Sequence, residues 1–301
     1  MNQVKRRKFL KLATLPALAP IAFGQKLINN TTPIGCSNLK LSLNAFSFNG
    51  PLSKGEMTVE QMIDFCAEAG FAAVDITAYY FPHYPLVPGD DYLYHIKQYA
   101  FLKGIDISGT GVRNDFTDPD AAKRKGHVQL VKNWVLAAAK LGAPVVRVFS
   151  GNMEPDGYSR DQVAEWMVKD LKECVEFGKK NGVVVAVQNH YDFIRTPEQA
   201  EKLIKMVDSE WFGLILDTGG YRFGDPYAEI AKSIPYTVNW QIKEKIFVNN
   251  EEVDVDMPRL IKVIKNGCYN GYVPIETLGA GDPKKKVLAL LDLLKKAIAD
   301  T

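Results

Sequence analysis

The string VVVAVQNH, residues 183–190, decides the fold. It joins five apolar residues without alternation to three polar ones, a pattern typical of a strand that is buried on both faces of a parallel sheet. Three later apolar runs end in the same manner, in Asp217-Thr218, Gln241-Ile242-Lys243 and Glu276-Thr277. Counted from Gln188, the first polar residues are 29, 24 and 35 residues apart, which is the length of one strand, one helix and two loops. We therefore expect successive β/α units whose polar side chains converge at the carboxyl ends of the strands.

The same alternation of strand-like and helix-like segments extends from residue 40 onward. Runs rich in β-branched and aromatic residues predict eight strands, at residues 41–46, 72–77, 105–110, 145–149, 183–188, 212–217, 237–242 and 272–276. Helical patterns predict eight helices, near residues 58–69, 90–103, 118–141, 160–181, 197–207, 226–233, 256–266 and 283–299. Glycines lie between a predicted helix and the next strand, where a left-handed cap is expected, at Gly70, Gly104, Gly142, Gly182 and Gly271. Eight units in about 260 residues predict an α/β fold, a single-domain (β/α)8 TIM barrel.

A doubly wound open sheet is the rival architecture. Such a sheet would more naturally carry a glycine-rich phosphate turn after its first strand. This chain has Ser47-Phe48-Asn49-Gly50-Pro51 at that point, which is no such motif. The barrel is therefore the better prediction.

The first residues have the features of an export signal. Residues 5–11 are basic (KRRKFLK), residues 12–23 are apolar, and Ala22-Phe23-Gly24 has the small-x-small pattern of a cleavage site. The paired arginines resemble those of a twin-arginine signal. We expect a signal peptide over residues 1–24, a linker over 25–39 and the barrel over 40–301, in a periplasmic or otherwise exported protein. An amphipathic N-terminal helix of the mature fold is the alternative.

Charge and composition exclude some classes of partner. Residues 1–24 carry five basic residues and no acidic one, so cleavage would change the formal net charge from +2 to −3. A mildly acidic domain gives no electrostatic basis for binding nucleic acid. No apolar run reaches the roughly 18 to 20 residues that a membrane span needs.

The cysteines show no C-x-x-C spacing. Cys66, Cys174 and Cys268 fall in or beside predicted helices and are expected to be buried structural thiols. In an oxidising compartment a disulfide is the alternative. Cys36 is the fourth cysteine.

The four polar strand ends resemble the site of the xylose isomerase-like barrel superfamily, which includes sugar phosphate isomerases and epimerases and one type of AP endonuclease. The resemblance runs from about residue 40 to 299. In that family the fifth strand commonly ends Glu-Asn-His, the sixth carries Asp, the seventh reads His-x-Lys-Asp and the eighth ends in Glu. The first Glu, the Asp, the seventh-strand His and the last Glu hold one divalent metal.

This chain matches that pattern only in part. Asp217 and Glu276 are retained, whereas Gln188 replaces the first Glu and Gln241 replaces the His. Asn189, His190 and Lys243 keep further residues of the motifs, and Glu244 replaces the Asp after the lysine. The resemblance implies a divalent metal, such as Mn or Mg, held by these four residues, which we call the frame. Amide oxygens are acceptable ligands for hard cations, but the loss of one carboxylate weakens the expected site. A metal-free pocket, in which the frame binds substrate hydroxyls, is the alternative.

The substitutions also limit the chemistry. Family epimerases resemble two-base enzymes with two metal-held glutamates, and a glutamine has no useful basic group, so Gln188 does not act as a base. Glu276 is the expected catalytic base, with His190 or Lys243 as its partner. We expect an exported carbohydrate isomerase or epimerase that abstracts a proton next to a carbonyl. A lyase or hydratase on a keto sugar or cyclic polyol, and a non-catalytic sugar-binding barrel, stay open.

Other residues are expected to bind a carbohydrate substrate at the mouth of the barrel. They are Asn189 beside Gln188, the loop residues His83, Arg113 and Glu154, and Trp240, which is either a core residue or a sugar-stacking platform. The sequence shows no glycine-rich phosphate cradle, which favours a non-phosphorylated sugar. His95 and His127 lie in predicted helices and are expected on the surface, and Arg147 is expected to be structural.

Overall fold

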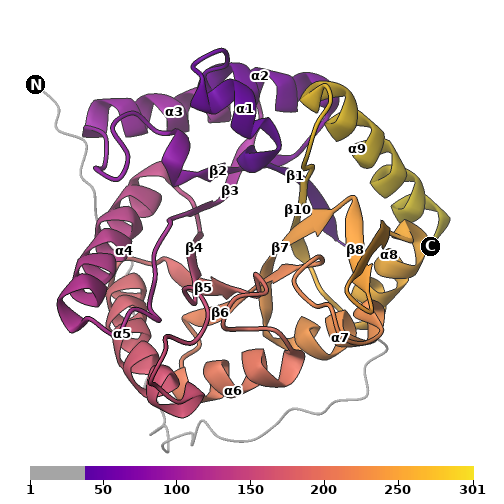
Figure 1. The fold of residues 1–301 in the computed structure, drawn as a ribbon. Helices are drawn as coiled ribbons and strands as arrows, with labels where there is room; N and C mark the ends of the chain where they lie inside the picture. Colours follow the sequence, from indigo (N-terminus) through magenta and orange to yellow (C-terminus); the bar gives the residue numbers. More distant parts are fainter. Residues whose placement is uncertain (1–37) are drawn as a thin grey trace, which may run out of the picture. The chain divides into compact units, whose positions relative to one another are not determined.

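The computed structural model describes residues 38–301, which form a closed barrel of eight parallel strands. The strands pair in the order β1-β10-β7-β6-β5-β4-β3-β2, and a ring of helices surrounds them (Figure 1). The predicted single-domain (β/α)8 barrel is therefore confirmed. The predicted signal peptide and most of the predicted linker lie outside the described residues.

The barrel strands begin within two residues of their predicted positions. They are β1 (Leu39–Asn44), β2 (Ala73–Thr77), β3 (Asp106–Gly111), β4 (Val145–Phe149), β5 (Val184–Gln188), β6 (Phe212–Asp217), β7 (Thr237–Lys243) and β10 (Gly271–Glu276). Parallel pairing aligns their carboxyl ends, as when Phe149 pairs with Gln188 and Asp217 pairs with Gln241. This alignment brings distant polar residues to one face of the barrel.

Each helix of the outer ring follows a strand. The ring consists of α2 (Val59–Ala69), α3 (Asp90–Leu102), α4 (Ala121–Leu141), α5 (Arg160–Lys180), α6 (Pro197–Val207), α7 (Pro226–Ser233), α8 (Met257–Asn266) and α9 (Pro283–Asp300). Local sequence fixes their ends. Thr58 and Gln61 form a capping box at the start of α2, and Gly70 ends this helix with a φ of 79°.

Short elements that were not predicted interrupt the repeat. They are α1 (Asn49–Ser53), the 3-10 turns at Ala45–Phe48, Ala78–Tyr80 and Ile234–Tyr236, and the antiparallel hairpin of β8 (Lys245–Val248) and β9 (Glu251–Asp254). Asn249 and Asn250 join the hairpin strands with φ values of 51° and 64°, as a type I′ turn requires. The hairpin follows β7 directly and adds chain at the carboxyl end of the barrel.

Alternate residues of each barrel strand face two environments, the hydrophobic core shared with the helices and the interior of the barrel. In β4, Val146 and Val148 are fully buried in the large hydrophobic core, which includes residues of the surrounding helices, whereas Arg147 lies on the opposite face. The barrel interior contains buried polar contacts: the hydroxyls of Ser42 and Ser108 are 2.7 Å apart, and Asn239 Nδ2 donates to the Ser108 carbonyl. Burial raises the pKa of Asp75 to about 6, and the charge of Arg147 partly opposes this shift.

The cysteine prediction is confirmed for two residues and wrong for a third. Cys66 and Cys174 are buried free thiols, and burial raises the pKa of both. Cys268 lies just beyond α8, where it is exposed and disulfide-bonded. Within residues 38–301, no helix is both long and apolar enough to cross a membrane.

Candidate functional site

A cavity of about 580 Å³ opens at the carboxyl ends of the strands. Residues at or near the ends of six strands line it: Asn44, Thr77, Phe149, Gln188, Gln241 and Glu276. Catalytic groups of (β/α)8 enzymes lie at this end of the barrel. The cavity is therefore the candidate active site.

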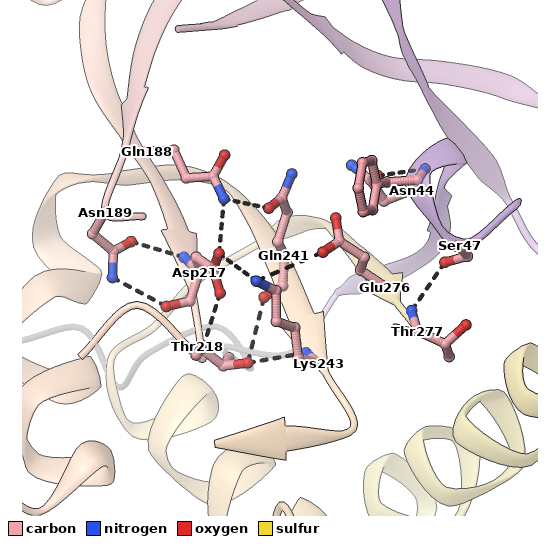
Figure 2. Close-up of polar contacts among 12 residues, drawn as sticks. Asn44, Ser47, Gln188, Asn189, Asp217, Thr218, Gln241, Lys243, Glu276 and Thr277 are labelled. Atoms are coloured by element: carbon pink, nitrogen blue, oxygen red, sulfur yellow. Dashed lines mark hydrogen bonds and ion pairs between the residues drawn. The ribbon is translucent and has the colours of Figure 1, made fainter. Parts of the chain in front are cut away.

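A hydrogen-bonded cluster forms one wall of the cavity (Figure 2). Gln188 Nε2 donates to Asp217 Oδ2 at 2.8 Å and to Gln241 Oε1 at 2.5 Å. Lys243 Nζ donates to the same Asp217 Oδ2 at 2.8 Å and lies 3.6 Å from Glu276 Oε1. Gln188, Asp217 and Gln241 are therefore hydrogen-bonded to one another, and Lys243 links Glu276 to this group.

Backbone and amide groups fix the position of Asp217. Asn189 Nδ2 donates to the Asp217 carbonyl, and Asn189 Oδ1 accepts from the Asp217 N–H. Gly219 N–H donates to Asp217 Oδ1 at 2.9 Å. A Cβ at Gly220 would lie 1.7 Å from the Asn189 carbonyl oxygen, so only glycine fits the next position of this turn.

Lys243 is held behind the cavity wall. Its side chain is 13% exposed, and it is absent from the cavity lining. Its backbone N–H donates to Thr218 Oγ1, and a Cβ at Gly219 would lie 3.2 Å from Lys243 Cδ. The turn after β6 is thus shaped around the lysine side chain. Lys243 contacts the carboxylates of Asp217 and Glu276 rather than the space open to a ligand.

The protonation of these groups follows from burial and charge. Burial opposes the charged form of Lys243, but the carboxylates of Asp217 and Glu276 outweigh it and raise the pKa of the ammonium. Burial raises the pKa of Glu276 to about 7, against the effect of Lys243. Burial lowers the pKa of His190 to about 4, so its imidazole is neutral at pH 7. Its ring lies 4.8 Å from that of Phe149.

A second group of polar residues lines the cavity away from the frame. It includes Arg113, Asp115, His127, Asn152 and Asp192. Asp192 Oδ1 accepts from Ser150 Oγ at 2.6 Å and from the Ile194 N–H at 3.1 Å, whereas Oδ2 has no hydrogen-bond partner among residues 38–301. Burial raises the pKa of Asp192 to about 6. Asp192 therefore lines the cavity with a carboxylate that has one buried, unpaired oxygen.

His127 and Arg147 take part in the cavity lining, although the sequence analysis placed His127 on the surface and gave Arg147 a structural role. His127 belongs to the first two turns of α4, which begin at the carboxyl end of β3 and therefore lie at the mouth. Arg147 Nη1 donates to the Val112 carbonyl and Nη2 to the Tyr79 hydroxyl, both at 2.6 Å. Arg147 is thus held by hydrogen bonds, is buried, and lines the cavity.

Residues 63–297 match the sequence family described as xylose isomerase-like TIM barrel. The chain belongs to this family. The xylose isomerase-like fold is also found in similar solved structures. D-psicose 3-epimerase from Clostridium cellulolyticum H10 is 16% identical, with a TM-score of 0.70, over 86% of this chain and 99% of that one. A comparison with curated protein sequences found no match.

Two further similar structures differ in their named activities. The 3-keto-D-glucoside 4-epimerase from E. coli is 14% identical, with a TM-score of 0.68, over 86% of this chain and 99% of that one. The probable 3-DHS dehydratase of petrobactin synthesis from Bacillus anthracis is 14% identical, with a TM-score of 0.69, over 85% of this chain and 98% of that one. At these identities the likeness establishes the fold alone.

The frame of this xylose isomerase-like barrel does not fit the divalent metal that the family resemblance implies. The Asp217 carboxylate already accepts three protein hydrogen bonds, and Gln241 Oε1 accepts one from Gln188. The Lys243 ammonium lies against both carboxylates. Repulsion between a single and a double positive charge about 4 Å apart is about 8 kcal/mol at an effective dielectric constant of about 20. Residues 38–301 contain no group of three or more His, Cys, Asp or Glu placed to hold a metal.

Four residues expected to bind substrate lie outside the cavity lining, unlike Arg113. Asn189 is fully buried, and both its amide N–H₂ and its amide oxygen are hydrogen-bonded to the Asp217 backbone. Trp240 is also fully buried, with its ring centroid 5.6 Å from that of Tyr269, because it lies on the outer face of β7. Glu154 is ion-paired with Arg160 and Arg195, and His83 is exposed in its loop. The structure therefore places these four side chains away from a ligand in this cavity.

Proposed function

We propose that the protein is a carbohydrate isomerase or epimerase that transfers a proton at a carbon next to a carbonyl. The observation that carries this proposal is Glu276, a buried carboxyl with a pKa of about 7 that lines the cavity beside the two amides of the frame. A group with this pKa both accepts and returns a proton near neutral pH, as a general acid–base catalyst must. The similar structures include epimerases named for D-psicose and for a 3-keto-D-glucoside, which supports a keto sugar as substrate.

The proton transfer follows from the groups that line the cavity. The Glu276 carboxylate takes the proton of the C–H bond, and the electron pair of that bond moves toward the carbonyl oxygen to give an enediolate. Gln241 and Arg147 supply N–H donors beside the cavity that would stabilise the charge on this oxygen. Return of the proton from Glu276 to the neighbouring carbon, with transfer of the hydroxyl proton from one oxygen of the enediolate to the other, gives the isomer. Return from the opposite face would give the epimer, but His190, which lines the cavity, has to be protonated before it can donate there, so its low pKa favours the single-base isomerisation.

An elimination is the second candidate. A single basic carboxylate with hydrogen-bond donors nearby also suits loss of a hydroxyl group from the carbon adjacent to the enediolate, which releases water. The frame offers one basic residue where family epimerases have two, and one similar structure is named as a probable dehydratase. Product analysis separates the two reactions, because only the elimination yields an unsaturated sugar.

The cavity favours a ligand rich in hydroxyl groups. Gln188 Oε1 is buried and, like Asp192 Oδ2, has no hydrogen-bond partner among residues 38–301. A buried acceptor that stays unpaired costs about 1–3 kcal/mol. Both residues line the cavity, so two sugar hydroxyls would satisfy them. This supports a non-phosphorylated carbohydrate as the substrate.

Exchange of a substrate C–H with solvent deuterium tests the proposal. The purified protein is incubated with aldoses, ketoses and 3-keto glycosides in D2O, and products are followed by NMR. We expect exchange with at least one keto sugar and its loss by about 10²-fold or more in Glu276→Gln. Glu154→Gln is the matched control, because Glu154 lies outside the cavity lining. Saturable binding without exchange would instead support the sugar-binding alternative.

We also propose that the protein acts outside the cytoplasm, on the strength of its basic, apolar and small-residue zones at residues 5–24. Cell fractionation of the full chain tests this, with Arg6→Lys/Arg7→Lys as the variant. We expect the wild-type barrel in the periplasm and the variant retained inside the cell. Equal distribution of both would contradict the use of a twin-arginine route.

A further inference from the structure

The centre of the frame already contains a positive charge. Lys243 Nζ lies 2.8 Å from Asp217 Oδ2 and 3.6 Å from Glu276 Oε1, and these are the two carboxylates that the frame retains. The dashed contacts of Figure 2 join Asp217 to both Lys243 and Gln188. One ammonium therefore faces both acidic residues that the family resemblance assigns to a metal.

The surrounding chain is built to keep the ammonium there. Gly219 leaves room for the lysine stem, since a Cβ at this position would lie 3.2 Å from Lys243 Cδ. The Lys243 backbone N–H donates a hydrogen bond to Thr218 Oγ1, and the Lys243 side chain is 13% exposed. Burial of a lysine without a partner is unfavourable, so the two carboxylates stabilise it and are in turn stabilised by it.

The two amides complete the same network. Because Gln188 Nε2 donates to Asp217 Oδ2 and to Gln241 Oε1, each amide has a hydrogen-bonding role that does not involve a cation. A Glu at position 188 and a neutral His at 241 would change the charge of the cluster by one unit. With two carboxylates and one ammonium, the present set needs less added positive charge than a set with three carboxylates.

We propose that, with Gln188 and Gln241 in place of the Glu and His of the family pattern, Lys243 is the resident cation of this site, which takes the place of the divalent metal and holds Asp217 and Glu276 in position. Lys243 is a positioning residue, because it lies behind the cavity lining and acts on a ligand through Glu276. This assignment concerns metal binding and does not depend on the proposed reaction. Turnover without added metal is a further consequence, which does rest on the proposed function.

Calorimetric titration with Mn²⁺ after treatment with EDTA tests the assignment. The wild-type protein is compared with the double variant Gln188→Glu/Gln241→His and with the triple variant that adds Lys243→Ala. We expect no stoichiometric binding by the wild type, and binding by the triple variant at least about tenfold tighter than by the double variant, because the ammonium repels the metal. Adding Lys245→Ala to the double variant is the matched control, since Lys245 pairs with Asp254 on the hairpin.

Two results would overturn the assignment. One is stoichiometric Mn²⁺ binding by the wild type that Asp217→Asn abolishes, and the other is equal affinity of the double and triple variants. Circular dichroism and thermal unfolding of each variant show whether the barrel is intact, and the wild-type titration needs no variant. If no sugar in the deuterium experiment reacts, the proposed function fails, while the titration still decides what cation the frame holds.

Discussion

The side-chain amide of Asn189 forms hydrogen bonds with both the N–H and the C=O of Asp217. Its Nδ2 donates to the Asp217 carbonyl at 3.0 Å, and its Oδ1 accepts from the Asp217 N–H at 2.8 Å. The side chain thus continues the sheet pairing of β5 and β6 beyond the last strand residues. Since Asp217 bonds both Gln188 and Lys243, Asn189 sets the geometry of the whole frame without lining the cavity.

Asn189→Ala is expected to destabilise the protein and to disturb the frame. The change leaves the buried N–H of Asp217 unpaired, whereas the Asp217 carbonyl keeps its bond from the Gly220 N–H, which predicts a loss of about 1–3 kcal/mol in the free energy of unfolding. Urea unfolding measures this loss. Asn133→Ala, on an exposed part of α4, is the matched control and should change stability by less than about 0.5 kcal/mol. Equal effects of the two substitutions would contradict the positioning role.

Trp240→Phe is expected to leave ligand binding and turnover unchanged. Trp240 is fully buried away from the cavity, and its Nε1 has no hydrogen-bond partner among residues 38–301. Removal of an unpaired N–H offsets part of the lost ring volume, so stability should change by less than about 1.5 kcal/mol. Phe149→Leu serves for comparison, because Phe149 lines the cavity against His190. A larger rise in KM for Trp240→Phe than for Phe149→Leu would mean that the tryptophan contacts the sugar.

Asp75→Asn is expected to stabilise the protein at high pH. The folded-state pKa of Asp75 is about 6 against an ordinary 3.8, so the folded state favours the protonated carboxyl. The stability that this proton supplies is present below pH 3.8 and is lost as the pH rises through about 6. A shift of roughly two units corresponds to about 3 kcal/mol. The stability difference between variant and wild type should therefore grow by up to about 3 kcal/mol from pH 4 to pH 8, as measured by urea unfolding. A constant difference would contradict the raised pKa.

Periodicity accounts for what the sequence predicted correctly. The apolar runs and the glycines after the helices located every barrel strand to within two residues of its start. The alternation of strand side chains also predicts the direction in which neighbouring residues point. Gln241 and Lys243 are two residues apart and so share a face of β7, whereas Trp240 must point the other way. The same argument directs Asn189 away from the face of Gln188.

Other features depend on contacts that no local pattern encodes. The ion pairs of Lys243 with Asp217 and Glu276 join three strands. The distances between these charged atoms depend on how the strands are placed in the closed barrel, which the sequence pattern does not give. Glu154 was expected at the mouth, but Arg160 and Arg195 bind it outside the cavity lining. The hairpin of β8 and β9 was missed because its strands are short and charged, although Asn249-Asn250 is a recognisable turn signal.

Asp192→Asn is expected to weaken substrate binding more than catalysis. The substitution keeps an acceptor for Ser150 and for the Ile194 N–H, but it places an amide N–H₂ at the position of Oδ2, the unpaired oxygen of this cavity-lining residue. Loss of a hydrogen bond between a sugar hydroxyl and a carboxylate predicts a rise in KM of about 10-fold or more, with kcat changed by less than about threefold. Asp161→Asn, on the surface near the start of α5, is the matched control. Because the pKa of Asp192 is about 6, the wild-type KM should also rise as the pH falls below this value, and that rise should be absent in the variant. A fall in kcat at constant KM would instead assign Asp192 to the chemical step.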